Sequence, residues 1–182
     1  MGFKGGFIMK GKLEKIAKEI LKDFPQIKEQ PASLSAKNHF GETSLQHLEY
    51  TASIMRHLCD SLNIHGEDRD MLIACAYLHD LGIYIITCKG KMNGSEWTYY
   101  KKTGWSRRNA WMPYHAKLSA DILEEYNIPR KEEIQKIIST HMNHWYKNTP
   151  KATNLYEYLM VEADYLATRK KLLKFNGENK NE

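Results

Sequence analysis

The chain of 182 residues contains little cysteine and no long apolar run. Its three cysteines, Cys59, Cys75 and Cys88, are an odd number at no spacing typical of a metal site. Cys59 and Cys75 lie within helical patterns, so we expect reduced core residues and no disulfide. The longest apolar stretches, such as IACAYL and YLMV, fall far short of the roughly 20 residues that span a bilayer. No membrane segment is predicted.

The sequence also lacks a secretory signal and the common nucleophile and phosphate-binding motifs. The N-terminus has neither a continuous apolar segment nor a small-residue cleavage site, so we expect a cytoplasmic protein. No P-loop and no G-x-S-x-G sequence is present. Phosphate binding by a Walker loop and serine catalysis of that type are therefore not indicated.

The composition fits one soluble globular domain, with 42% hydrophobic and 27% charged residues. The net charge of +5 is modest but unevenly distributed. Basic clusters occur at 89–91, 101–102, 107–108 and 169–171. They favour an anionic partner, although each cluster taken alone is equally well explained as a solvated surface.

Apolar residues recur three and four apart along most of the chain, which predicts an all-α fold. Helices are expected over 12–24, from 43, over 68–81 with Gly82 closing the helix, and over 114–127, 131–146 and 153–173. Residues 83–113 have β-prone ends around a glycine-containing turn and predict a small hairpin or ordered loop. We expect one domain over 43–173, preceded by a leader, accessory helix and loop over 1–42 and followed by a disordered tail over 174–182.

Four histidines lie on or at the rim of the apolar faces of four different predicted helices: His47, His79, His115 and His141. One such histidine is more often a satisfied core residue than a ligand. Four of them, with Asp80 directly after His79, are hard to satisfy in a core without a metal, because imidazole and carboxylate are the ligands of borderline transition metals. Asp164 is a further candidate ligand, although an N-cap or ion-pair role stays open, and Glu162 lies on the leucine side of the same helix.

The ordered set, together with the stretches TSLQHLEYTA, YLHDLG, YHAKLSADIL and EADYLATRK, resembles the HD-domain superfamily of metal-dependent phosphohydrolases over roughly residues 43–170. The resemblance implies an all-α HD-domain helical bundle and a dinuclear metal centre bridged by Asp80. Its implied metal ligands are His47, His79, Asp80, His115, His141 and Asp164, with Asp80 and His79 as the catalytic residues. Many members carry a lysine where this chain has Ile83, so any help from that lysine must come from elsewhere. His144, three residues from His141, is a weaker candidate ligand.

The resemblance implies hydrolysis of a phosphoester by a metal-bound hydroxide, with two divalent ions drawn from Mn, Fe, Co, Ni, Mg or Zn. The insertion over 89–114 interleaves cations with aromatic residues, which suits a phosphorylated small molecule, a nucleotide or single-stranded nucleic acid. We expect substrate contacts from Lys89, Lys91, Lys101, Trp105, Arg107 and Arg108. A local mini-core beneath a surface hairpin explains the aromatic residues equally well.

Two other functions fit the same residues. Some HD-fold proteins with this richer ligand set use a di-iron centre to cleave carbon–carbon or carbon–phosphorus bonds with oxygen. A nucleotide or metal sensor without turnover is the third hypothesis. Iron content, oxygen uptake and turnover distinguish the three.

Overall fold

The computed structural model describes residues 12–30, 32, 42–86, 92–93, 96–97, 111–147 and 149–169. The α-helices are α1 (Leu13–Ile20), α3 (Ser44–Ser61), α4 (Gly66–Leu78), α5 (Leu81–Ile86), α6 (Trp111–Ile122), α7 (Lys131–Ser139) and α8 (Leu155–Ala167). Short 3-10 turns are η1 (Leu21–Asp23), η2 (Pro25–Lys28), η3 (Leu123–Glu125) and η4 (His141–His144). The prediction of an all-α fold is confirmed.

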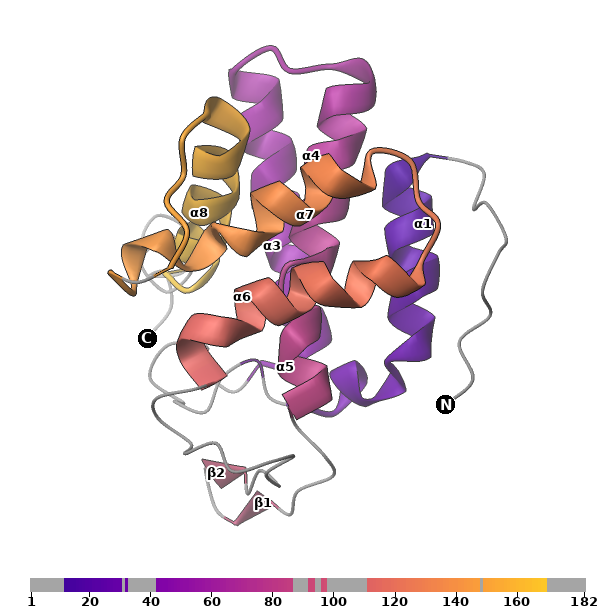
Figure 1. Ribbon diagram of the computed structural model, residues 1–182, viewed down its shortest axis with the longest axis vertical. Coiled ribbons are helices and arrows are strands. Elements are labelled where there is room, and N and C mark those ends of the chain that lie inside the picture. Colours follow the sequence, from indigo (N-terminus) through magenta and orange to yellow (C-terminus); the bar gives the residue numbers. More distant parts are fainter. Residues whose placement is uncertain are drawn as a thin grey trace, which may run out of the picture.

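Helix α4 lies at the centre of the bundle (Figure 1). It packs against α1, α3, α7 and α8, and α5 continues beyond its end to pack against α6. Every residue of α4 from Met71 to Leu78 is buried. Because this helix is apolar all round, the other helices must surround it to remove it from water.

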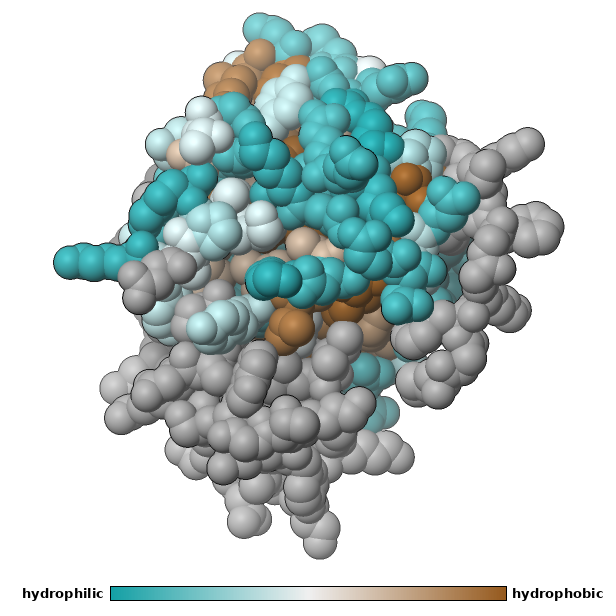
Figure 2. Space-filling view, in the orientation of Figure 1, coloured by the Kyte–Doolittle hydropathy of each residue, from teal (hydrophilic) through white to brown (hydrophobic). Residues whose placement is uncertain are grey.

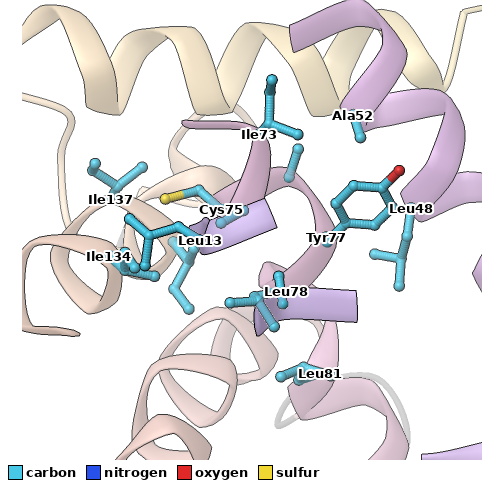
Figure 3. Packing of buried hydrophobic residues seen from close by; sticks show 14 of the residues in the cluster. Leu13, Leu48, Ala52, Ile73, Cys75, Tyr77, Leu78, Leu81, Ile134 and Ile137 are labelled. Atoms are coloured by element: carbon cyan, nitrogen blue, oxygen red, sulfur yellow. The ribbon is translucent and has the colours of Figure 1, made fainter. Parts of the chain in front are cut away.

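The surface contrasts with this core. Hydrophilic side chains cover most of the described surface on the face shown in Figure 2, and apolar side chains are exposed there in small groups. Figure 3 shows the interior, where Ile73, Cys75 and Leu78 of α4 meet side chains of α1 and α7. Both described cysteines, Cys59 and Cys75, are buried free thiols, as predicted.

Helix α3 begins at a capping box that also places the first histidine of the set. The Thr43 hydroxyl accepts from the Gln46 backbone N–H at 3.3 Å, and the Gln46 side chain accepts from the Thr43 N–H at 2.9 Å. This reciprocal pair satisfies two of the N–H groups that a helix start leaves open. His47 therefore lies in the first turn of the helix, with a fixed direction.

Gly82 does not close the helix before it, so that prediction is wrong. Helix α4 ends at Leu78, the next two residues form a turn, and Gly82 lies inside α5. Its role is close packing: a Cβ atom there would clash with the His115 carbonyl oxygen and lie 2.8 Å from the Ser119 backbone nitrogen. The glycine allows α5 to approach α6 at backbone distance.

The helix predicted over 131–146 is also interrupted. It ends at Ser139, and His141 opens the separate turn η4. The Thr140 hydroxyl donates to the Ile137 carbonyl oxygen at 2.8 Å, which offers that carbonyl a partner other than the next helical turn. His141 therefore projects from a tight turn instead of a regular helix face.

The predicted insertion over 83–113 is helical at both ends, because residues 83–86 belong to α5 and 111–113 to α6, so the expectation of β-prone ends is wrong. Between these helices the described residues form two short antiparallel strands, β1 (Met92–Asn93) and β2 (Glu96–Trp97), with Met92 opposite Trp97. No helix in the described part of the chain is long and apolar enough to cross a membrane. Residues 1–11, the tail over 174–182 and the segments 87–91, 94–95 and 98–110 of the insertion lie outside the described residues, and the domain boundaries stay a prediction.

Candidate metal centre

Six side chains from five separate segments converge inside the bundle. His47 comes from α3, His79 and Asp80 from the turn between α4 and α5, His115 from α6, His141 from η4, and Asp164 from α8. Their exposed fractions range from 0% to 6%. Charged or titratable groups reach such burial only when they are paired or bind a metal.

One oxygen of Asp80 faces a first pair of imidazoles. Its Oδ2 lies 3.6 Å from His47 Nε2 and 3.4 Å from His79 Nε2. Asp164 Oδ1 approaches the same two nitrogens, at 3.1 Å from His47 and 3.6 Å from His79. Two imidazole nitrogens and two carboxylate oxygens therefore surround one point.

The other oxygen of Asp80 faces a second pair. Its Oδ1 lies 3.2 Å from His115 Nε2 and 3.4 Å from His141 Nε2. Those two nitrogens are 2.8 Å apart, so both are directed at a common position. The single carboxylate of Asp80 thus links two groups of ligand atoms.

Backbone carbonyls orient two of the imidazoles for binding through Nε2. His79 Nδ1 lies 2.9 Å from the Ala76 carbonyl oxygen, and His141 Nδ1 lies 2.7 Å from that of Ile138. A carbonyl only accepts, so Nδ1 carries the proton in both rings and Nε2 is left as the ligand atom of the neutral ring. Metal-binding histidines are held in this way.

The donor set fits a divalent transition cation. Close groups of potential ligand atoms are formed by His47, His79 and Asp164 and by His79, Asp80 and His141. The Nε2 atom of His79 is buried and has no hydrogen-bond partner among the described residues. Such an atom is costly in a protein interior, and a metal ion would satisfy it.

The family comparison agrees with this geometry. The family model of the HD domain matches residues 44–169, which is most of the chain. The chain belongs to the HD domain family. Searches of the curated proteins and of the solved structures gave no match. The HD superfamily includes metal-dependent phosphohydrolases, and the buried histidines and aspartates of this HD domain are suited to hold metal ions.

The two carboxylates of the candidate metal centre, Asp80 and Asp164, are held in the charged form. Burial alone would raise the pKa of Asp80, but the imidazoles of His79, His115 and His141 hold it well below its usual range. Burial acts likewise on Asp164, and His47 and His79 bring its pKa far below the ordinary value. Both side chains therefore present anionic oxygens at neutral pH, as metal binding requires.

The histidines respond to the same field in different ways. Burial opposes a charge on His79, but Asp80 and Asp164 outweigh it and raise its pKa to about 9. Burial lowers the pKa of His141, and the neighbouring His115 and His79 lower it further against the effect of Asp80. His141 is therefore held in the neutral form that a metal ligand needs, whereas His79 would have to lose a proton before it could bind a cation.

Ser119 ties the HD turn to the helix that carries His115. Its buried hydroxyl accepts from the Gly82 backbone N–H at 2.8 Å and donates to the His115 carbonyl oxygen at 2.8 Å. Gly82 follows Asp80 by two residues, so this hydroxyl fixes the distance between the bridging carboxylate and His115. The sequence pattern gave no sign of this role.

The predicted ligands come together, but the predicted substrate contacts cannot be placed. Lys89, Lys91, Lys101, Trp105, Arg107 and Arg108 lie outside the described residues. The backbone of His144 belongs to η4, and its side chain is not described. Asp164 lies well inside α8, so it is not an N-cap, and Glu162 is partly exposed.

Glu42 is a buried carboxylate that the sequence analysis missed. Its Oε1 lies 3.8 Å from His47 Nδ1, on the side of the ring that faces away from Asp164. It precedes the N-cap of α3, a position that looks like part of a surface loop in the sequence. The only sequence signal for Glu42 was its position five residues before a candidate ligand. Acidic residues at such a spacing are too common for this signal to single it out.

Proposed function

We propose that this HD domain is a metal-dependent phosphohydrolase that hydrolyses a phosphoester of a nucleotide or nucleic acid. The observation that carries the proposal is the placement of Asp80, whose two oxygens face two different pairs of imidazoles. One bridging carboxylate between two ligand groups is the arrangement that holds two cations close together. The ligand groups are fixed by three helices and two turns, so they are positioned before substrate arrives.

We assign one ion to His47, His79, Asp164 and Asp80 Oδ2, and a second to His115, His141 and Asp80 Oδ1. Two divalent cations held this way would lower the pKa of a water molecule and neutralise the charge that develops on a phosphoryl group. Asp80 and His79 are thus catalytic through the cations that they hold. We propose that the ions are drawn from Mn, Fe, Co, Ni, Mg and Zn.

The protein's own residues supply orientation and low polarity. The Ala76 and Ile138 carbonyls keep His79 and His141 turned toward the centre. Burial of all six ligands strengthens their interaction with a charged group, since little water competes there. We assign phosphate and base contacts to the segment 89–114, with Lys89, Lys91, Lys101, Trp105, Arg107 and Arg108 as the residues involved.

The test is hydrolysis of bis(p-nitrophenyl) phosphate and p-nitrophenyl phosphate by protein freed of metal with a chelator and reloaded with Mn²⁺. Asp80→Asn keeps the shape of the side chain but replaces one bridging oxygen with an amide that cannot bind a cation. We expect loss of turnover to the level of the protein-free control and loss of at least one bound ion. The exposed carboxylate variant Asp121→Asn is the matched control and should retain both.

Three outcomes contradict the proposal. Full activity of Asp80→Asn would place the turnover in a contaminant or at another site. Absence of turnover with every divalent ion, together with tightly bound iron and oxygen uptake, would favour the di-iron oxygenase. Metal and nucleotide binding without either reaction would favour a sensor.

A further inference from the structure

Two aromatic rings and one guanidinium group meet on segments that adjoin two candidate ligands. The Trp145 and Tyr165 rings have centroids 5.5 Å apart and planes inclined by 39°. The Arg169 guanidinium lies 5.0 Å from the Tyr165 centroid and 6.0 Å from that of Trp145. All three side chains are partly exposed, and we call this cluster the Trp145 platform.

The platform is attached to the segments that carry two candidate ligands. Tyr165 directly follows Asp164 on α8, and Trp145 directly follows the turn η4 that His141 opens. Turn η4 packs against α8 and also contacts α6, which carries His115. In Figure 1 η4, the orange turn after α7, lies beside α8. The platform is therefore built on the same two segments, η4 with the residue after it and α8 with the residues after it, that carry His141 and Asp164.

The chemistry of these three groups matches that of a nucleobase. A base offers a flat π surface, and proteins bind it by stacking on aromatic rings and on arginine planes. The positive charge of Arg169 is suited to the phosphates of the same molecule. A phosphorylated sugar without a base offers no π surface to stack on the rings.

We propose that Trp145, Tyr165 and Arg169 form a base-binding subsite, so that the substrate of this centre is a nucleotide or an exposed end of single-stranded nucleic acid. The inference rests on the proposed function, because the base belongs to the molecule whose phosphoester the metal centre hydrolyses. It assigns base recognition to described residues, Trp145 after η4, Tyr165 of α8 and Arg169 after α8, in addition to the 89–114 segment.

The experiment compares adenosine 5′-monophosphate with ribose 5-phosphate, which carries the same phosphoester without the base. We expect the Mn²⁺-loaded protein to prefer the nucleotide in kcat/KM by roughly tenfold or more, the scale of one stacked base. Tyr165→Ala should bring this ratio close to one. Tyr165→Phe retains the ring and should retain the ratio.

Tyr158→Ala is the matched control, because Tyr158 lies on the same helix seven residues earlier and is 49% exposed. It should leave the ratio unchanged. Arg169→Lys keeps the charge but removes the flat guanidinium, and we expect it to lower the ratio. This variant keeps the proposal testable if Tyr165→Ala does not fold.

Equal kcat/KM for the two phosphates in the wild type overturns the inference, as does a full ratio in both Tyr165→Ala and Arg169→Lys. A purely structural contact between η4 and α8 would change thermal stability without changing the ratio. Calorimetry that compares the binding of adenosine with that of ribose separates the base-binding subsite from the proposed hydrolysis. Adenosine binding that Tyr165→Ala removes, in a protein without any turnover, would refute hydrolysis and keep the base-binding subsite.

Discussion

At the scale of the residue, the notable group is His79, which lies between two carboxylates. Asp80 and Asp164 raise its pKa to about 9 although burial opposes the charge. A proton on the His79 ring and a bound metal cation would each neutralise the charge of Asp80 and Asp164, so the two compete for the same site. Metal binding should therefore release protons and grow stronger as the pH rises.

This predicts how the stability of the chelated protein depends on pH. The folded-state pKa of His79 lies above the ordinary value of 6.5, so its contribution is fully present below about pH 6.5. It is lost as the pH rises through about 9. Urea denaturation of the chelated protein should therefore show a lower unfolding free energy at high pH than at pH 6.5.

His79→Gln is the control for this prediction, since glutamine does not titrate. The variant should lose most of the decrease between neutral and alkaline pH. An equal decrease in both proteins would assign the effect to other groups. Tyrosines are the main such groups, because burial raises the pKa of Tyr146 and a hydrogen bond to Asp68 raises that of Tyr156.

At the scale of the element, the decisive contact is the close approach of α5 and α6. Gly82 removes the side chain that would separate them, and the Ser119 hydroxyl joins their backbones. Helix α5 follows Asp80 directly, and α6 carries His115. The spacing of the two elements therefore sets the distance from Asp80 Oδ1 to His115.

Ser119→Ala should destabilise the protein by about 1–3 kcal/mol, because the buried Gly82 N–H loses its acceptor. We also expect weaker binding of the ion assigned to His115 and His141. The ion assigned to His47, His79 and Asp164 should be less affected. Metal titration of the chelated protein by calorimetry measures both.

Ser139→Ala is the matched control, since the Ser139 hydroxyl makes an exposed local hydrogen bond to the Lys136 carbonyl oxygen at 2.8 Å. It should change the unfolding free energy by less than about 0.5 kcal/mol. Equal losses of both ions in Ser119→Ala would show a general loosening of the fold instead of a local change at α6.

At the scale of the whole molecule, helix α1 extends the HD domain beyond the residues that the family model matches. Its Ile16, Ala17 and Ile20 belong to the same buried cluster as α4. The Asp70 carboxylate of α4 accepts from the Leu13 and Glu14 backbone N–H groups at the start of α1. Helix α1 thus completes the covering of α4 and forms part of the same core.

Ile20→Ala should therefore cost about 2–5 kcal/mol of unfolding free energy, which is the usual range for a fully buried aliphatic side chain. Metal stoichiometry of the folded protein should be unchanged, because α1 supplies no ligand. Leu62→Ala, at a side chain that is 48% exposed, is the control and should cost little. A small effect of Ile20→Ala would show that α1 packs loosely and is dispensable.

Local sequence chemistry determined much of this protein. Helical periodicity predicted the bundle, and the order of His47, His79, Asp80, His115, His141 and Asp164 indicated the centre. The predicted bundle is confirmed, and the six candidate side chains lie together because a buried histidine or aspartate stands out within an apolar helix face. That they bind metal ions stays a prediction. The capping box at Thr43 is equally local, since its two partners are three residues apart.

Tertiary structure alone decided which atoms meet. The two carboxylate oxygens of Asp80 face different imidazole pairs because five segments cross at this point. No spacing along the chain encodes that crossing. The same holds for Glu42 beside His47, for Ser119 between α5 and α6, and for Trp145 against Tyr165. Gly82 was misread because a glycine near a helix end looks the same in sequence whether it ends the helix or admits a neighbouring backbone.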